Sequence, residues 1–256
     1  MNSAADNFKT LYEKAQKDPN ILGFFLGGSR GKGFQTKYSD YDVYIIVNDD
    51  VVMEYKVKYP KHKFEGLDLI IFSYSEFKNY ASWGSSEVWD RYTFSHVKAK
   101  IDKNGKIQEI LDEKGKIPEK FLSKFIAGSL DAYINYLYRS LKCIRDKDIE
   151  AARLEAAFSI PYFLNVIFAI HNGRLNPYYK YLKWELTSFP LSKFSMSAKE
   201  IVDNLMKILD NADYKTQQKL LRISEVALRK EGFGNIFDSW GDDFLWMKNF
   251  KPLTEK

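Results

Sequence analysis

The chain has 256 residues, a formal net charge of +5, 45% hydrophobic residues and 29% charged residues. This composition is typical of a folded protein with one large domain or two modest ones, and it excludes a disordered chain. The charge permits an anionic ligand but is too mild for a dedicated nucleic-acid binder. Cys143 is the only cysteine, which excludes a disulfide framework and a thiolate-rich metal site.

Membrane association is not expected from the apolar segments. The first residues lack the apolar core of a signal peptide. The longest apolar run, residues 156–170, is too short to span a bilayer, and Ser159, Pro161 and Asn165 interrupt it. We therefore expect a soluble, cytoplasmic protein.

The first half of the chain alternates between helix and strand patterns. Residues 3–18 predict an amphipathic helix, because apolar side chains recur there on one helical face. Short apolar runs bounded by polar or turn residues predict strands at 21–27, 42–47, 67–72 and 97–102. A further helix is expected over residues 73–80.

The second half reads as a set of helices. From Pro118 onward, apolar residues recur at spacings of three and four, with few strand signals. The patterns cover residues 118–160, 178–188, 197–209, 213–231 and 235–249. We predict an α+β protein, in which a small mixed-sheet domain (residues 1–115) precedes an all-helical bundle domain (residues 116–256).

Two aspartates at the start of the second predicted strand suggest a metal site. Asp40 and Asp42 are two residues apart, so their side chains share one face of a strand. Neighbouring carboxylates repel each other unless a cation lies between them, and Mg²⁺ prefers such oxygen ligands. Asp68 begins the next strand and could complete a site for two Mg²⁺ ions, which suits phosphoryl transfer. An isolated Asp-x-Asp pair also occurs in ordinary turns, and Asp68 alone could be a strand-end residue.

A glycine-rich turn, GGSRGKG, follows the first predicted strand. Its glycines let backbone amides approach an anion closely, and a helix opening at Ser29 would add N–H groups for phosphate oxygens. Arg30 and Lys32 could add charge-assisted contacts. The spacing departs from the Walker A loop and from the dinucleotide fingerprint.

The combination of these motifs resembles a known family. GGS, ten intervening residues, DYD and a later strand with another aspartate resemble the nucleotidyltransferase superfamily of DNA polymerase beta. A catalytic domain followed by helices is more specifically similar to the antibiotic nucleotidyltransferases, which act on aminoglycosides or lincosamides. The resemblance implies that Asp40, Asp42 and Asp68 bind metal and that Gly28 and Ser29 bind nucleotide phosphates.

Two residues of the helical half are weaker candidates. Some antibiotic nucleotidyltransferases use a glutamate of the helical domain as general base, a role for which Glu155 is the candidate here. The alternative is a helix residue held in a salt bridge. Lys180 is a candidate for a triphosphate contact, with a surface lysine as the alternative reading.

The expected reaction is transfer of AMP from a nucleoside triphosphate to a hydroxyl of a small acceptor, with Asp68 or Glu155 taking the proton. A role in antibiotic resistance would follow from an antibiotic acceptor. The alternative is an antitoxin-type nucleotidyltransferase that modifies or binds a partner protein. Addition to RNA ends is disfavoured by the mild charge, and a homodimer is left open.

Overall fold

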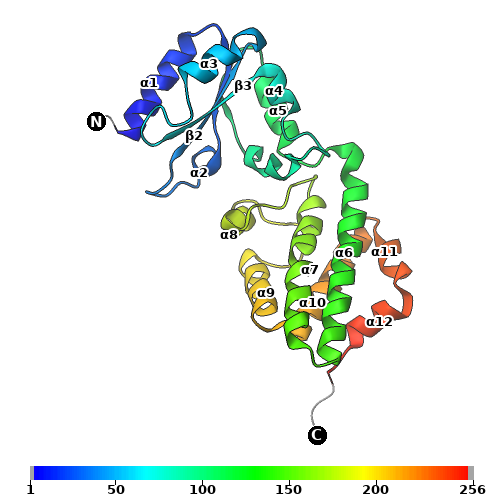
Figure 1. Cartoon of the computed structure of the whole chain (residues 1–256). Coiled ribbons are helices and arrows are strands. Elements are labelled where there is room, and N and C mark those ends of the chain that lie inside the picture. Colours follow the sequence, from blue (N-terminus) through cyan, green and yellow to red (C-terminus); the bar gives the residue numbers. More distant parts are fainter. Residues whose placement is uncertain (1–2, 253–256) are drawn as a thin grey trace. The chain divides into compact units, whose positions relative to one another are not determined.

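The structure is a computed structural model that describes residues 3–252 (Figure 1). The chain divides into two compact units, of which the first ends at Pro118 and the second begins at Glu119. The sequence predicted a domain boundary between residues 115 and 116. The assignment of a catalytic domain before it and a helical domain after it stays a prediction. Among the described residues, no helix has the length and apolar character needed to cross a membrane.

A four-stranded mixed sheet forms the centre of the first unit, in the strand order β3-β2-β1-β4. Strand β1 is antiparallel to both of its neighbours, whereas β2 and β3 are parallel. The mixed sheet confirms the predicted α+β class. The elements of this unit are α1 (Ala4–Lys17), β1 (Ile21–Leu26), α2 (Gly28–Gly31), β2 (Tyr41–Val47), η1 (Asp49–Val51), α3 (Val52–Lys58), β3 (Leu67–Ser73), α4 (Tyr74–Asn79), η2 (Val88–Phe94), β4 (Ala99–Asp102) and α5 (Lys106–Lys114).

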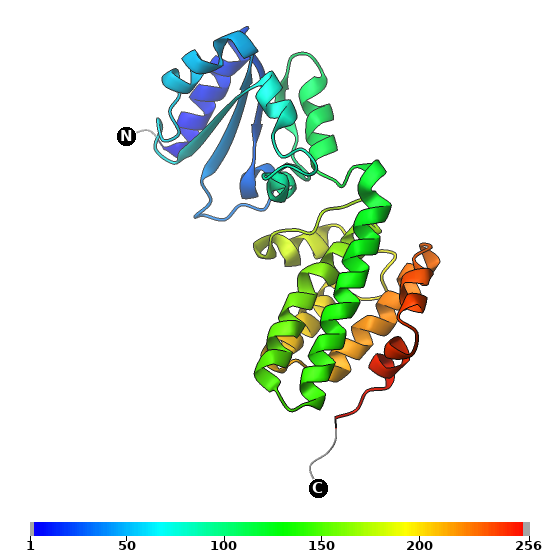
Figure 2. The same cartoon turned by 45° about the vertical axis from the view of Figure 1, so that its right-hand side comes forward.

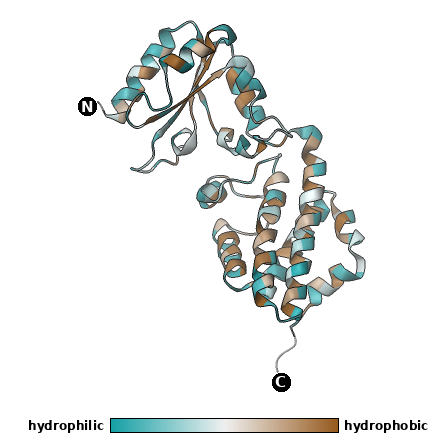
Figure 3. Ribbon diagram, viewed as in Figure 1, coloured by the Kyte–Doolittle hydropathy of each residue, from teal (hydrophilic) through white to brown (hydrophobic). Residues whose placement is uncertain are grey.

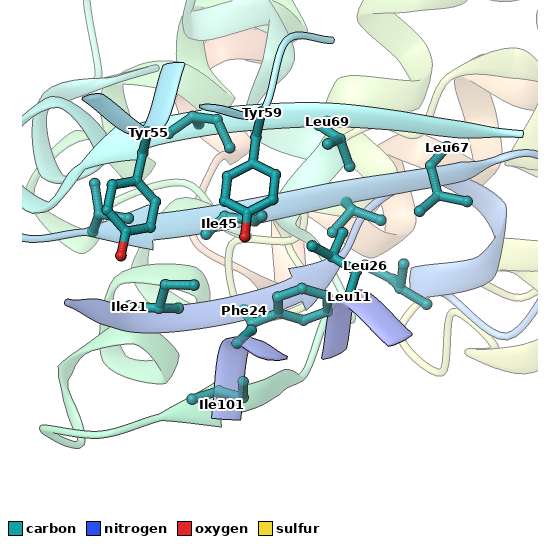
Figure 4. Packing of buried hydrophobic residues seen from close by; sticks show 14 residues of the cluster. Leu11, Ile21, Phe24, Leu26, Ile45, Tyr55, Tyr59, Leu67, Leu69 and Ile101 are labelled. Carbon is teal, nitrogen blue, oxygen red and sulfur yellow. The ribbon is translucent and has the colours of Figure 1, made fainter. Parts of the chain in front are cut away.

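Helices cover both faces of this sheet. Helices α1 and α3 contribute Leu11 and Tyr55 to a core on one face, where Phe24 and Ile45 of the central strands also pack (Figure 4). The opposite face packs against α4, η2 and α5 through a second core around Phe25. Because alternate side chains of a strand point to opposite faces, the central strands must be apolar on both sides. In Figure 3 the strands of the sheet are mostly brown, the colour of hydrophobic residues.

Local sequence signals explain where several helices begin. The side chain of Ser3 caps α1 in a reciprocal pair with Asp6, and Ser73 caps α4 in the same way with Glu76. The sequence-based prediction did not include α3 or α5, which are short helices with many charged residues. Their positions depend on a few buried side chains, such as Tyr55 and Leu111, that contact the sheet cores.

The second unit consists of helices in the described part of the chain. The long helices α6 and α7 lie side by side in both cartoon views (Figures 1 and 2). Ser140 of α6 donates a hydrogen bond to the Ala152 carbonyl of α7. The elements are α6 (Glu119–Arg145), α7 (Ile149–Ala169), α8 (Tyr179–Ser188), α9 (Ala198–Asn211), α10 (Tyr214–Lys230), α11 (Gly234–Ser239) and α12 (Gly241–Asn249). The single pattern predicted over residues 235–249 is therefore two helices, separated at Trp240.

Candidate active site

Three carboxylates converge at one end of the parallel strand pair. Asp42 of β2 is the direct register partner of Asp68 of β3, and Asp40 immediately precedes β2. One ligand oxygen from each of Asp40, Asp42 and Asp68 lies within 4.8 Å of the other two. Asp40 and Asp42 lie at alternate positions with Tyr44, and Asp68 lies two residues before Ile70 on β3. Their side chains therefore face the same side of the sheet as Tyr44 and Ile70.

The glycine turn after β1 lies directly against Asp42. The amide N–H of Gly27 donates to the Asp42 carbonyl oxygen at 2.8 Å. Gly28 has a positive φ of +54°, and a Cβ built on it would lie only 2.0 Å from Asp42 Oδ2. A side chain at Gly28 is thus excluded by both backbone conformation and contact with the carboxylate.

Arg30 and Ser29 contact the segment that precedes Asp42. The Arg30 guanidinium donates to the carbonyl oxygens of Ser39, at 2.8 Å, and Asp40, at 2.9 Å. It also lies 3.9 Å from the centre of the Tyr41 ring. The hydroxyl of Ser29 donates to that of Ser39 at 2.8 Å. These contacts hold the chain in position around Asp40.

Lys32 belongs to the core of the first unit rather than to an exposed phosphate cradle. Only 7% of its surface is exposed. Its ammonium donates to the carbonyl oxygens of Tyr92, Thr93 and Ser95 at 2.9, 3.3 and 2.5 Å. The charged group that the sequence offered as a phosphate contact therefore links the glycine turn to η2.

A lysine and a histidine side chain contact Asp68, and sequence reasoning did not find them. His62 Nδ1 lies 2.9 Å from Asp68 Oδ1, and Lys61 Nζ lies 3.5 Å from Asp68 Oδ2. The Leu69 amide donates to the Lys61 carbonyl at 2.8 Å, which fastens this loop to β3. The signal in the sequence is the pair of basic residues, Lys61 and His62, shortly before Asp68.

The donor set fits a hard divalent cation. Three carboxylates offer oxygen ligands at one place, and Mg²⁺ binds such groups together with substrate phosphates. In the structure, Lys61 offsets part of the negative charge at Asp68, and His62 contacts the same carboxylate. The arrangement therefore suits binding of a metal–triphosphate group beside the glycine turn.

Glu155 and Lys180 belong to the second unit and are described within it. Glu155 is largely buried on α7 and forms an ion pair with Arg139 of α6 at 2.5 Å. Lys180 is exposed on α8, with its ammonium 4.8 Å from the centre of the Tyr181 ring. These contacts agree with the structural alternatives for both residues, and their proposed roles in catalysis stay predictions.

Comparison with known proteins identifies the class to which this site belongs. Residues 9–135 match the model of the nucleotidyltransferase domain family, and this segment contains the sheet, the glycine turn and all three aspartates. A solved structure of a nucleotidyltransferase-like protein from Exiguobacterium sibiricum 255-15 is similar at 10% identity and a TM-score of 0.42. That similarity covers 93% of this chain and 77% of the other chain. No curated protein matches the chain.

Residues 9–135 thus resemble a nucleotidyltransferase domain, and the chain is a transferase. The domain implies a nucleoside triphosphate as substrate. Its family usually uses divalent metals, for which the aspartate cluster is the candidate site.

Proposed function

We propose that the protein transfers AMP from ATP to a hydroxyl group of a small-molecule acceptor, such as an antibiotic. The proposal rests on the convergence of Asp40, Asp42 and Asp68 within 4.8 Å beside Gly28, inside a nucleotidyltransferase domain. The family match supports nucleotidyl transfer in general. The preference for AMP and for a small acceptor is our addition to it.

The carboxylates are proposed to hold two Mg²⁺ ions, which when bound would offset the charge of the triphosphate and lower the pKa of the acceptor hydroxyl. During transfer, the hydroxyl oxygen forms a bond to the α-phosphorus of the nucleotide. The bond between that phosphorus and the oxygen bridging to the β-phosphate breaks, and pyrophosphate leaves. The hydroxyl proton passes to a carboxylate, for which we propose Asp68.

Other proposed roles follow from position. Gly28 and Ser29 are assigned to the leaving phosphates, because the glycine turn borders Asp42. Arg30 and Lys180 remain proposed phosphate contacts. The bonds from Arg30 to the Ser39 and Asp40 carbonyls also give Arg30 a positioning role. Glu155 is the alternative proton acceptor, although its ion pair with Arg139 favours a structural role.

The proposal is tested by incubating the protein with Mg²⁺ and nucleoside triphosphates labelled at the α-phosphate. Acceptors are a panel of antibiotics, tRNA and candidate proteins. We expect label from ATP to appear on a small hydroxyl-bearing compound. Asp42→Asn should lower the rate at least about a hundredfold, since loss of metal-held charge costs several kcal/mol in the transition state.

The matched control is Asp50→Asn, which removes an exposed carboxylate from η1, outside the aspartate cluster. It should leave the rate unchanged. Label found only on a protein would replace this proposal with the antitoxin-type alternative, and label found only on tRNA would replace it with RNA modification. Full activity in Asp42→Asn would disprove the metal assignment.

A further inference from the structure

An apolar pocket lies within the second unit, between helices α7, α8 and α9. Its volume is about 460 Å³, and most of the surface that lines it is apolar. Ile160, Leu182 and Leu205 form a buried part of its wall, whereas Tyr179, Met206 and Leu209 are exposed. The pocket is formed entirely by helices of one compact unit, and its volume is that of a site for a drug-sized molecule.

Helix α9 has more apolar surface than its packing in the bundle requires. Ile201, Leu205 and Ile208 are buried. A second stripe, formed by Val202, Leu205, Met206 and Leu209, has the spacing of one helical face and lines the pocket. Met206 is 50% exposed and Leu209 is 41% exposed. Covering this stripe would therefore remove further apolar surface from water, which is favourable.

Lys183 supplies a charge at this otherwise apolar site. It is the one lysine or arginine among the described lining residues. Its side chain is exposed on α8, and in the described part of the chain no carboxylate lies at ion-pair distance from its ammonium. An unpaired cation at the edge of an apolar pocket is complementary to a molecule with an apolar body and one anionic group.

We propose that this pocket binds a small, largely apolar anion, with an aromatic or alicyclic body against Met206 and Leu209 and a carboxylate or sulfonate at Lys183. The flexible side chain of Met206 can adapt to bodies of different shape. A single helix of a partner would instead need an apolar groove several turns long. This inference is independent of the proposed nucleotidyl transfer, because its site and its test involve no nucleotide.

The probe is 8-anilinonaphthalene-1-sulfonate, an aromatic anion whose fluorescence rises in apolar surroundings. We expect saturable binding of one molecule to the full-length native protein, with a Kd of roughly tens of micromolar for a ligand of this size. Met206→Glu should weaken binding at least about tenfold, because it places a negative charge in the pocket. Val226→Glu, at a 58% exposed apolar residue of α10 outside the pocket, is the matched control and should bind normally.

The role of Lys183 is tested with the uncharged analogue that lacks the sulfonate. The wild-type protein should bind the anion more tightly than the uncharged analogue. Lys183→Gln should lower the affinity for the anion by about three- to tenfold and leave the affinity for the uncharged analogue unchanged. Lys207→Gln, an exposed lysine of α9 that does not line the pocket, should change neither affinity.

Three results would overturn the proposal. The first is absence of saturable binding, and the second is equal affinity in the wild-type, Met206→Glu and Lys183→Gln proteins. The third is a dimer of the wild-type protein that Met206→Glu dissociates, since a second copy would then occupy the pocket. Circular dichroism of every variant excludes binding of the probe to a loosened fold.

Discussion

Gly28 and Asp42 approach so closely that a Cβ on Gly28 would lie 2.0 Å from the Oδ2 atom of Asp42. We therefore predict that Gly28→Ala displaces a carboxylate of the candidate metal site. A displacement of about 1 Å is enough to lower a transfer rate by about a hundredfold. Two quantities are measured: the rate of nucleotidyl transfer, and the affinity for Mn²⁺ as determined by electron paramagnetic resonance.

Gly33→Ala is the control that distinguishes the effect of the contact with Asp42 from the effect of backbone strain. Gly33 also has a positive φ, +70°, but a Cβ on it would meet no atom within 4 Å. Both substitutions should lower the free energy of unfolding by about 1–2 kcal/mol, because alanine is strained in the left-handed backbone conformation. Only Gly28→Ala should lose metal affinity and activity, and equal losses in both variants would contradict the role of the contact with Asp42.

A second prediction concerns competition for Asp68. Lys61 lies 3.5 Å from Asp68 Oδ2, so its charge repels any divalent cation bound at the three aspartates. Lys61→Gln should therefore tighten Mn²⁺ binding by about two- to tenfold at low ionic strength, and less in high salt. Lys9→Gln, on the exposed surface of α1, should have no such effect. Weaker Mn²⁺ binding in Lys61→Gln would show that Lys61 instead orients Asp68 for the cation.

A third prediction is that Lys32 stabilises the first unit. Replacing it with methionine keeps the length of the side chain but leaves the carbonyl oxygens of Tyr92, Thr93 and Ser95 without its three hydrogen bonds. Lys32→Met should lower the free energy of unfolding by about 2–4 kcal/mol in urea denaturation. The exposed Lys37 is the control, and Lys37→Met should change stability by less than about 0.5 kcal/mol. Equal stability of the two variants would contradict this role.

A fourth prediction concerns the pH dependence of stability. Lys114 is fully buried, and burial lowers the pKa of its ammonium to about 8. In the unfolded chain this pKa returns to its ordinary value of about 10.4. Between these values the unfolded state binds more protons, so the contribution of Lys114 to the free energy of unfolding becomes more favourable as pH rises.

Between pH 8 and pH 10 this gain should amount to about 2 kcal/mol for the wild-type protein relative to Lys114→Met. The neutral amine can still donate to the carbonyl oxygens of Lys78 and Tyr80, which accept its hydrogen bonds. Urea denaturation of both proteins at the two pH values measures the difference. An identical pH dependence in both would contradict a depressed pKa of Lys114.

The sequence predicted the strands of the sheet better than the short helices that cover it. The four strands and helices α1 and α4 were predicted near their observed positions, because short apolar runs and periodic apolar residues are local signals. Helices α3 and α5 were not predicted. They are short and rich in charge, and only a few of their side chains contact the sheet cores.

The sequence by itself determined which residues could form the candidate site: a glycine turn, then Asp40 and Asp42 at the start of a strand, then Asp68 on the next strand. Spacing along the chain is sufficient for this, because strand geometry places residues i and i+2 on the same face. Only the tertiary structure decided that Asp42 and Asp68 are register partners, that Gly28 contacts Asp42, and that Lys61 and His62 contact Asp68. It likewise placed Lys32 in the core. Such contacts depend on strand pairing and on the paths of loops, which spacing along the chain does not specify.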